Sequence, residues 1–405
     1  MHISNTCKSC AIGLSFLIVT AVRHALRYHK LRRRLLQLFL LTFFLWSTAD
    51  VFLVHRRFHE EQIHIDYRPP ERQRIYITSV QWNSERVLSK HWTDAVVELA
   101  HLFGPDNVYV SVYESGSSDG TKNALRELDE ALDRVGVQRS ITISDTSSED
   151  EASRTPDGQR HTSYFTRLRN DSLRPLFDLR DAGTFFDRIL FLSDVVFTRD
   201  DILSLLNTNY GAYTAACSFD ILKSPSKLDA FALRDADGYE HVMQKWPFFR
   251  SSTSRDAMKS MLPVPVRSCW GEIVFMHTEA FYSTRPIRFR GVPDGLGAKH
   301  IKASECCLIH ADNLLSKRRG VYLNPFVRIA DNVGEYSVAH PSIHWLSTWE
   351  IFESIWENRL RRWFSSPFLQ GWSLRSRFAK WQAEDEKNKE PGDFCLTSQP
   401  LTTVT

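Results

Sequence analysis

FFDRILFLSDVVFTRDDILSLL, residues 185–206, is the stretch that decides the fold. Its first part, 185–192, is a short run of aromatic and branched residues, which predicts a buried strand. Thr198 and Asp201 then precede a periodic apolar run, which is the pattern of a capped helix start. Asp194 therefore lies where a central strand ends, and ligands of open α/β sheets collect at that edge. The local pattern leaves two readings open: Asp194 holds a metal against phosphates, or it only ends a strand.

The composition is that of a globular protein with one large core or two smaller ones. The chain has 405 residues, of which 42% are hydrophobic and 12% aromatic. It carries 51 basic and 48 acidic residues, a net charge of +3. Nucleic-acid-binding domains usually show a marked basic excess, so we expect no nucleic-acid partner.

The cysteines indicate which metal sites and disulfides the chain could form. Cys7 and Cys10 form a CxxC without further zinc ligands nearby, so no zinc site is expected there. The later cysteines are Cys217, Cys269, Cys306, Cys307 and Cys395. If that part of the chain is lumenal, this odd set leaves at least one cysteine unpaired or paired between chains. A bond between the neighbours Cys306 and Cys307 is not expected, because the geometry is strained.

LLQLFLLTFFLWSTADVFLV, residues 35–54, predicts a membrane helix. A helix of this length is about 30 Å long, which matches the hydrocarbon core of a bilayer. A basic block lies just before it, whereas only Arg56 and Arg57 follow closely. The positive-inside rule then places the N-terminus in the cytosol and the bulk of the chain in the lumen. We expect a single-pass type II membrane protein with a cytosolic basic tail (1–34) and a stem (55–73).

Strand and helix patterns alternate after the stem. Strands are predicted at 74–80, 107–114 and 138–145, with helices at 85–103 and after 119. This order predicts a parallel, Rossmann-type half within an α/β fold. Further strands are expected at 211–221 and 266–282, while 303–315 fits either a strand or a helix. We place one large α/β domain at 74–340, an aromatic and basic helical extension at 341–385, and a disordered tail at 386–405.

Tryptophans are concentrated in the helical extension. Six of the 11 lie there: Trp345, Trp349, Trp356, Trp363, Trp372 and Trp381. Such a stripe predicts core packing or, as the alternative, contact with a membrane surface.

Two polar segments suggest further chemistry. In YESGSSDGT, Glu114 ends a predicted strand, and Ser117, Asp119 and Thr121 lead into a helix, whose first amides attract anions. Farther along, Glu305, His310 and Asp312 form a second acidic and imidazole cluster. Glu305 is a candidate to act on a reacting group, and His310 or Asp312 to complete a metal site.

The ordered blocks resemble the fungal capsule-associated α-1,3-mannosyltransferase family of the cryptococcal type. The blocks between Arg74 and Ala330 are RIYITSVQWN, VSVYESGSSDGT, RLRNDSLRPL, DRILFLSDVVFTRDDILSLL, AACSFDI, LRDADG, WPFF, VPVRSCWGEIV, RFRG, SECCLIHADN and NPFVRIA. The resemblance implies a GT-A-like fold with a mixed sheet, behind the transmembrane helix. It also implies a type II Golgi enzyme that transfers mannose from GDP-mannose, with retention, to a mannose-containing glycan.

The resemblance also implies roles for individual residues. Asp194 matches the metal-binding block, with Ser193 where asparagine is usual, and Mn²⁺ or Mg²⁺ is the expected ion. Gly271 stands where asparagine is common, which leaves acceptor choice open. The donor-binding candidates are Glu114, Ser117, Asp119, Thr121, Arg169, Asn170 and Arg290. The candidates for catalysis are Glu305 and Asp220, and the metal candidates are Asp194, His310 and Asp312.

Other functions remain open at this point. The chain is also compatible with a catalytically silent lumenal glycan-binding or scaffold subunit. A transferase that uses another sugar nucleotide, such as GDP-fucose or UDP-xylose, is a closer alternative. Asn170 begins a formal glycosylation sequon. The sequence leaves a homo-oligomer open.

Overall fold

A computed structural model describes residues 5–60, 73–144, 160–220, 232–340, 346–365 and 371–398. The side chains described are those of 30–57, 73–144, 164–219 and the last three ranges. The chain divides into two compact units, Met1–Arg56 and Arg57–Thr405.

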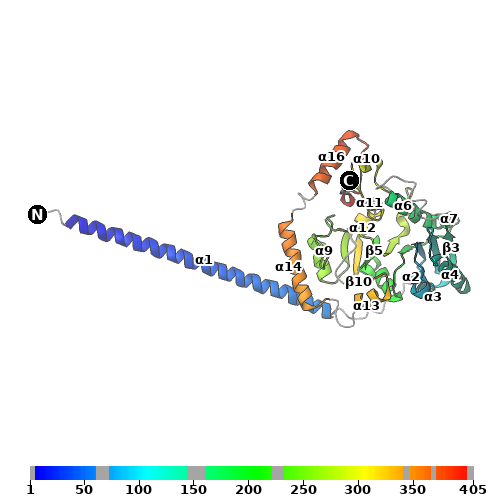
Figure 1. The fold of residues 1–405 in the computed structure, drawn as a ribbon, viewed down its shortest axis with the longest axis horizontal. Coiled ribbons are helices and arrows are strands. Elements are labelled where there is room, and N and C mark those ends of the chain that lie inside the picture. The colour runs from blue at the N-terminus through cyan, green and yellow to red at the C-terminus, as the bar shows by residue number, and fades with distance from the viewer. Residues whose placement is uncertain are drawn as a thin grey trace. The chain divides into compact units, whose positions relative to one another are not determined.

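The first unit is formed by one continuous helix, α1 (Asn5–Glu60) (Figure 1). Within α1, the segment Lys30–Arg57 is 28 residues long with a hydropathy of 1.7, long and apolar enough to cross a membrane. This segment contains the predicted anchor, 35–54. The first residues of the predicted stem, 55–60, continue the helix.

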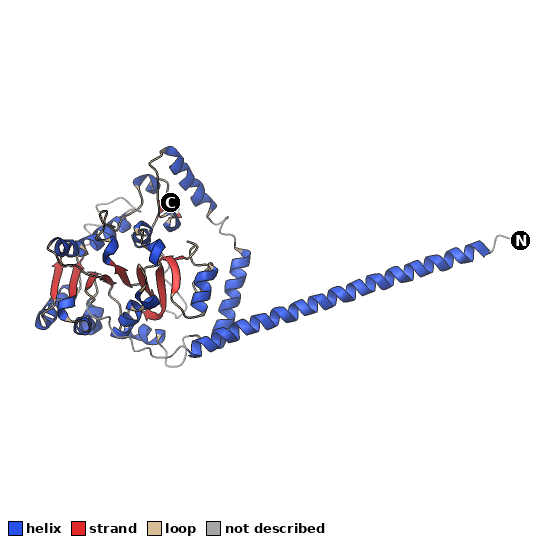
Figure 2. Cartoon of the chain, turned by 180° about the vertical axis from the view of Figure 1, so that it is seen from behind, coloured by secondary structure: helices blue, strands red, loops and turns tan. Residues whose placement is uncertain are grey.

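The second unit is built on a sheet of nine strands in the order β3-β2-β1-β4-β8-β5-β10-β7-β6. Figure 2 shows these strands, in red, with helices on both sides. The strands are β1 (Ile75–Gln81), β2 (Val108–Glu114), β3 (Gln138–Ile143), β4 (Arg188–Leu192), β5 (Ala215–Asp220), β6 (Arg234–Asp235), β7 (Val264–Ser268), β8 (Ile273–His277) and β10 (Val321–Ile329). β9 (Ile301–Lys302) and β11 (Thr397–Ser398) form a separate pair.

The helices of the second unit are interspersed with the strands along the chain. They are α2 (Glu85–Val87), α3 (Thr93–Phe103), α4 (Thr121–Val135), α6 (Arg160–Ser172), α7 (Arg174–Asp181), α8 (Arg199–Leu206), α9 (Ser252–Lys259), α10 (Asp294–Gly297), α11 (Glu305–Asp312), α12 (Ser316–Arg319), α13 (Val333–Ala339), α14 (Thr348–Phe364) and α16 (Trp372–Glu384). Short helical turns are η1 (Leu88–Trp92), η2 (Pro105–Asn107), η3 (Thr208–Gly211), η4 (Thr278–Ala280) and η5 (Asp393–Cys395).

The first half of the sheet is parallel, as predicted. β1 pairs in parallel with β2 and β4, and β2 pairs in parallel with β3. All five residues of β4 are buried, because helices cover both faces of a parallel sheet. β4 starts at Arg188 rather than Phe185, whose side chain is 54% exposed. α8 begins with the predicted capping box between Thr198 and Asp201.

The second half of the sheet is mixed. β8 lies antiparallel between β4 and β5, and β10 pairs in parallel with β5 and antiparallel with β7. The predicted α/β fold with a mixed, GT-A-like sheet is thereby confirmed. Residues 305–312, which fitted either a strand or a helix, form α11.

Two disulfides join distant parts of this half. They link Cys217 to Cys269 and Cys307 to Cys395, and Cys306 is a buried free thiol. The sequence predicted a disordered tail from 386, but 386–398 is packed chain in the structure. It is held by the bond to Cys395 and by pairing of β11 with β9. These partners lie too far away in sequence for a local pattern to reveal them.

The tryptophans of the helical extension have mixed environments. Trp381 is buried, whereas Trp349, Trp363 and Trp372 are 69%, 53% and 62% exposed. Trp345 lies outside the described residues. Core packing therefore accounts for only part of the stripe.

Candidate active site

One polar cluster gathers where β1, β2 and β4 end. Ser84 follows β1, and its hydroxyl donates to Asp194 Oδ2 over 2.8 Å. Its backbone amide donates to Thr121 Oγ1, at the start of α4, over 2.7 Å. Ser84 is buried and so connects the end of β4 to the turn after β2. We call Gln81, Ser84, Asp119, Thr121 and Asp194 the strand-edge cluster.

Asp119 and Glu85 accept hydrogen bonds from backbone amides around the start of α4. Asp119 Oδ1 accepts from the Thr121 amide at 3.0 Å, and Oδ2 accepts from the Glu85 amide at 3.2 Å. Burial raises the pKa of Asp119, but these hydrogen bonds outweigh it and hold the pKa below its usual value. Glu85 Oε2 accepts from the Gly120 amide at 2.9 Å. The start of α4 is thus occupied by the protein's own carboxylates.

Glu114 joins two loops. It is fully buried at the end of β2, and its carboxylate accepts from the amides of Ser117 and Ser144. The Ser117 hydroxyl accepts from the Asn83 amide at 3.0 Å. The predicted donor-binding residues Glu114, Ser117, Asp119 and Thr121 are therefore brought together, and their visible contacts shape the turn.

Gln81 was not predicted as a site residue. Its side chain is fully buried at the end of β1, and its Nε2 donates to Ser79 Oγ at 2.7 Å. Its Oε1 is buried and has no hydrogen-bond partner among the described residues. Buried oxygens are nearly always paired, so this one is a candidate to receive a donor group from a ligand. The only sequence signal was the position of Gln81 and Ser84 at a strand end.

Val196, two residues after Asp194, fixes the backbone beside the carboxylate. Val196 is buried, and its amide donates to the carbonyl of Ala330 at 2.9 Å. On the other side of Asp194, Trp92 Nε1 donates to the Ser193 carbonyl at 2.9 Å. Asp194 is thus held between two fixed backbone points.

A second cluster contains the catalytic candidate Glu305 and the donor candidate Arg169. Arg169 Nε lies 3.4 Å from Glu305 Oε1, and its guanidinium lies 4.7 Å from the Trp270 ring centre. The Cys306 thiol lies 3.5 Å from the same Glu305 oxygen. Burial lowers the pKa of Arg169, but nearby carboxylates, Glu305 among them, more than compensate, and the net pKa is raised. The guanidinium is therefore charged, while burial raises the pKa of Cys306 and keeps it a thiol.

Asn170 supports the aromatic wall of this cluster. Its Nδ2 donates to the Phe289 carbonyl at 2.9 Å, and its Oδ1 accepts from the Phe289 amide at 3.1 Å. The Phe289 ring lies 5.5 Å from that of Trp270. Both the nitrogen and the oxygen of the Asn170 side-chain amide bond to backbone. These contacts give Asn170 a structural role rather than a contact with a sugar.

Arg290, predicted on the donor side, forms an ion-pair cluster with two acids. Its Nε and Nη2 donate to Asp312 at 2.6 and 2.8 Å. Its Nη1 and Nη2 donate to Glu390 at 2.9 and 2.8 Å. Burial lowers the pKa of Arg290, but these bonds to carboxylates more than compensate and raise it. We call Arg290, Asp312 and Glu390 the C-terminal clamp.

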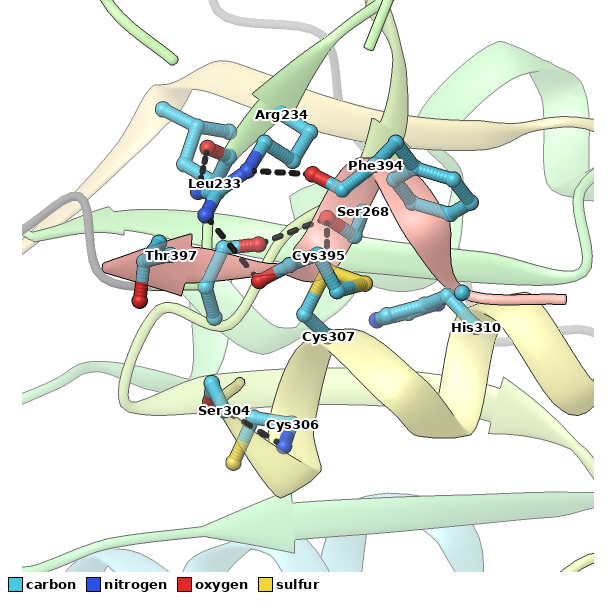
Figure 3. The surroundings of a disulfide bond; sticks show 12 residues. Leu233, Arg234, Ser268, Ser304, Cys306, Cys307, His310, Phe394, Cys395 and Thr397 are labelled. Atoms are coloured by element: carbon cyan, nitrogen blue, oxygen red, sulfur yellow. Dashed lines mark hydrogen bonds between the residues drawn. A yellow bond between two sulfur atoms is a disulfide. The ribbon is translucent and has the colours of Figure 1, made fainter. Parts of the chain in front are cut away.

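His310 lies on α11, the helix that also carries Cys307, whose disulfide to Cys395 is drawn in Figure 3. A ring nitrogen, Nε2, lies 2.7 Å from the Cys269 carbonyl. Burial lowers the pKa of His310 from 6.5 to about 4. Its metal-capable neighbours are Cys217 and Cys269, within 4.8 Å, but their sulfurs are bonded to each other.

The predicted metal ligands Asp194, His310 and Asp312 are not brought together in the described part of the chain. Asp194 belongs to the strand-edge cluster, Asp312 to the C-terminal clamp, and His310 to the surroundings of the disulfide. Asp220 ends β5, beside Ile329 of β10, and its side chain is not among those described.

Close packing explains why glycine stands at position 271. A Cβ at this position would lie 2.2 Å from the backbone oxygen of Ser218 in β5, closer than atoms approach. An asparagine there would require the chain to shift. The departure from the family pattern is thus accommodated by close packing beside the Cys217–Cys269 bond.

Comparison with known proteins gives a family match. The sequence pattern of the family described as Cryptococcal mannosyltransferase 1 matches residues 74–312. Alpha-1,3-mannosyltransferase CMT1 of Cryptococcus neoformans is 26% identical over 266 residues, which are 60% of this chain and 56% of that protein. The chain thus aligns with little more than half of this relative.

Solved glycosyltransferase structures show a distant likeness. Mannosyltransferase PcManGT from Pyrobaculum calidifontis, in complex with GDP-Man and Mn²⁺, is 12% identical, with a TM-score of 0.37 over 86% of both chains. Residues 1–349 of Staphylococcus aureus TarS are 12% identical, with a TM-score of 0.37, over 78% of this chain and 82% of that one. We draw no functional conclusion from likenesses at this level.

Proposed function

The chain belongs to the Cryptococcal mannosyltransferase 1 family, and from this premise we propose that it transfers mannose from GDP-mannose to a mannose-containing glycan. We further propose an α-1,3 linkage formed with retention of configuration. The observation that carries the proposal is the strand-edge cluster, where Ser84 joins Asp194 to the turn before α4. This cluster lies where α/β enzymes bind nucleotides.

The metal we propose is Mn²⁺ or Mg²⁺, held by Asp194. Both ions prefer oxygen ligands and often bind through one or two carboxylates together with substrate phosphates. In the strand-edge cluster the Asp194 carboxylate would be such a ligand, with the Ser84 hydroxyl bonded to it. When bound, the ion neutralises negative charge on the departing diphosphate. Ser84 orients the carboxylate for this task.

The start of α4 has a narrower role than the sequence predicted. The amides of Ser117, Ser118, Gly120 and Thr121 already donate to protein side chains. A diphosphate would therefore depend on the ion rather than on these amides. We assign the turn to shaping the nucleoside side of the site, with Gln81 Oε1 as an acceptor for a ribose or base donor group.

The sugar side of the site would be formed by Arg169, Glu305 and Trp270. A retaining transfer needs either a protein nucleophile or protection of one face of an oxocarbenium-like sugar. Glu305 is 8% exposed and beside a charged guanidinium, which supports it as one candidate. Asp220, at the end of β5, is the other. Arg290 and Asp312 are left out because they are paired with each other, and His310 because the two sulfurs beside it are joined in a disulfide.

We propose that α1 is a signal anchor and that the second unit faces the Golgi lumen. The apolar segment Lys30–Arg57 is compatible with a single membrane crossing. Two disulfides in the second unit support an oxidising compartment.

The test is a donor panel with the purified full chain in detergent. GDP-mannose, GDP-fucose and UDP-xylose are each offered with a mannose oligosaccharide and Mn²⁺, and product is followed by mass spectrometry. We expect transfer from GDP-mannose and its loss with a chelator. Transfer from another donor would replace the substrate assignment. A folded protein without turnover of any donor would favour the glycan-binding scaffold.

A further inference from the structure

Helix α14 is apolar on two sides. One side packs into the second unit through residues such as Ile351 and Ile355, which are 0% and 3% exposed. The other side carries large apolar residues that face solvent: Trp349 69%, Phe352 38%, Leu360 45%, Trp363 53% and Phe364 86% exposed. We call these five the aromatic stripe. Trp349, Phe352, Leu360 and Trp363 fall on one face by the 3.6-residue period.

The stripe is presented by a helix that is fixed to its unit. Asn358, on the inner side of α14, donates from Nδ2 to the Phe249 carbonyl at 3.4 Å. Arg250 donates to the Ser365 hydroxyl at the end of the helix, at 2.5 Å. Ser347 and Glu350 form a capping box at its start. The stripe is therefore a built surface rather than a loosely attached segment.

The residue types suit one kind of partner. Tryptophan prefers the boundary between lipid tails and water, because its ring is apolar and its N–H needs a polar partner. The stripe combines two tryptophans with phenylalanine and leucine. Apolar patches of this kind on a soluble surface mark interaction sites.

The charge on α14 indicates insertion rather than attraction to anionic headgroups. Its acidic residues are Glu350, Glu353 and Glu357, and its basic residues are Arg359, Arg361 and Arg362. Acid and base cancel, and Arg361 pairs with Glu357 at 2.8 Å. A surface of this kind binds through buried apolar area, so its contact should depend little on salt.

Chain connectivity favours the bilayer over a second copy of the protein. The segment Lys30–Arg57 ends at the first residue of the second unit, and β1 begins at Ile75. Even fully extended, the chain between them spans at most about 60 Å. If α1 crosses the membrane, a lipid surface is always within reach of α14, at a high effective concentration.

We propose that the aromatic stripe of α14 inserts into the lipid–water interface of the membrane that anchors the chain. This inference rests on the proposed membrane anchor, but not on the donor or the reaction. Its occupant is the interfacial zone of a neutral phospholipid bilayer. The catalytic unit would then have two attachments to the membrane, α1 and α14, instead of one flexible tether.

The test measures tryptophan quenching in the full chain, reconstituted in nanodiscs of phosphatidylcholine with or without brominated acyl chains. Wild type is compared with the double variant Trp349→Gln/Trp363→Gln. We expect brominated lipid to quench wild type more than the variant, by about the signal of two of the 11 tryptophans. Bromine near the headgroup end should quench the stripe better than bromine at the chain ends.

The controls separate the anchor from the stripe. Trp46 lies within α1, so quenching that persists in the double variant reports insertion of the anchor. Trp82→Gln removes a tryptophan that is 50% exposed outside α14, and it should leave the quenching unchanged. Equal quenching of wild type and double variant would overturn the stripe's insertion while the anchor stands. Absence of quenching in both would show that the anchor itself fails.

A second copy is the competing occupant, and single-molecule photobleaching in the same nanodiscs tests it. We expect one bleaching step for wild type and for the double variant. Two steps for wild type and one for the variant would overturn the lipid assignment in favour of a protein interface. Because the substituted side chains are exposed, circular dichroism should show both proteins folded.

Discussion

The strand-edge cluster and the C-terminal clamp both contain carboxylates, but these carboxylates have different partners. In the clamp, one guanidinium donates to two carboxylates, so every charge has an opposite charge beside it. In the strand-edge cluster, Asp194 has a neutral partner, Ser84, and Gln81 Oε1, at the end of β1, has no hydrogen-bond partner among the described residues. Carboxylates that are paired with an arginine stabilise the fold. A carboxylate whose partner is neutral keeps its charge available for a ligand.

The largest expected effect is that of Asp194→Asn. If Asp194 holds the metal, the variant loses stabilisation of the leaving diphosphate, which we put at about 4 kcal/mol, or roughly 1000-fold in kcat. The melting temperature should hardly change, because Asp194 is not paired with a buried charge. Initial rates with GDP-mannose and thermal unfolding measure the two quantities.

Asp200→Asn is the matched control, since that carboxylate is 70% exposed on α8. It should keep full activity. If Asp194→Asn turns over normally, Asp194 is not a metal ligand. The two clusters would then not differ in function.

The clamp should give the opposite result. Arg290→Met leaves Asp312 and the buried Glu390 carboxylate without a cation, so we expect the free energy of unfolding to fall by about 3 kcal/mol. The KM for the donor should stay unchanged in the protein that remains folded. Denaturant unfolding and donor titration make the comparison.

Arg285→Met, at an exposed arginine nearby, serves as its control and should change neither quantity. A raised KM for the donor at unchanged stability would contradict the clamp. It would restore Arg290 as the phosphate ligand that the sequence suggested.

The stability that buried His310 contributes should depend on pH, which tests whether it has a structural role like that of the clamp. Its folded pKa of about 4 lies below the ordinary 6.5, so the unfolded chain takes up the proton first as pH falls. The associated stability is fully present above pH 6.5 and is lost between pH 6.5 and 4, by about 3 kcal/mol. The stability advantage of wild type over His310→Gln should therefore shrink across this window. If His310→Gln instead shifts the Mn²⁺ dependence of activity, the residue is a metal ligand.

Local pattern was enough to predict the half of the sheet that carries the strand-edge cluster. Buried strands, a capping box at Thr198 and a small-residue turn are visible within a few residues of chain. The sequence therefore located Asp194 at a strand end, and Asp119 and Thr121 at the start of a helix. It missed Ser84, because its bond to Asp194 joins residues 110 positions apart.

The clamp could not be predicted in this way. Arg290 and Glu390 are 100 positions apart, and Cys307 and Cys395 are separated by 88. Residue type alone suggested that Arg290 binds phosphate and that Asp312 and His310 bind metal. Which charges are already matched is a property of the folded chain, and here it favours a structural role for Arg290 and Asp312.

The smallest effect is expected for Ser84→Ala, and it examines the link within the strand-edge cluster. The variant loses the hydroxyl that orients Asp194, which we put at about 1.4 kcal/mol, or roughly tenfold in kcat. The Mn²⁺ concentration for half-maximal rate should rise, a change that a purely structural serine would not cause. Ser84→Thr, which keeps a hydroxyl, should restore both.

Ser89→Ala is the control for Ser84, because the Ser89 hydroxyl donates only to the Glu85 carbonyl of its own helical turn. It should leave the Mn²⁺ dependence unchanged. If Ser84→Ala lowers stability without altering that dependence, Ser84 belongs with the framework, as the clamp does. Asp194 would then be the one metal ligand identified in the strand-edge cluster, and the remaining ligands would have to come from side chains such as Asp220.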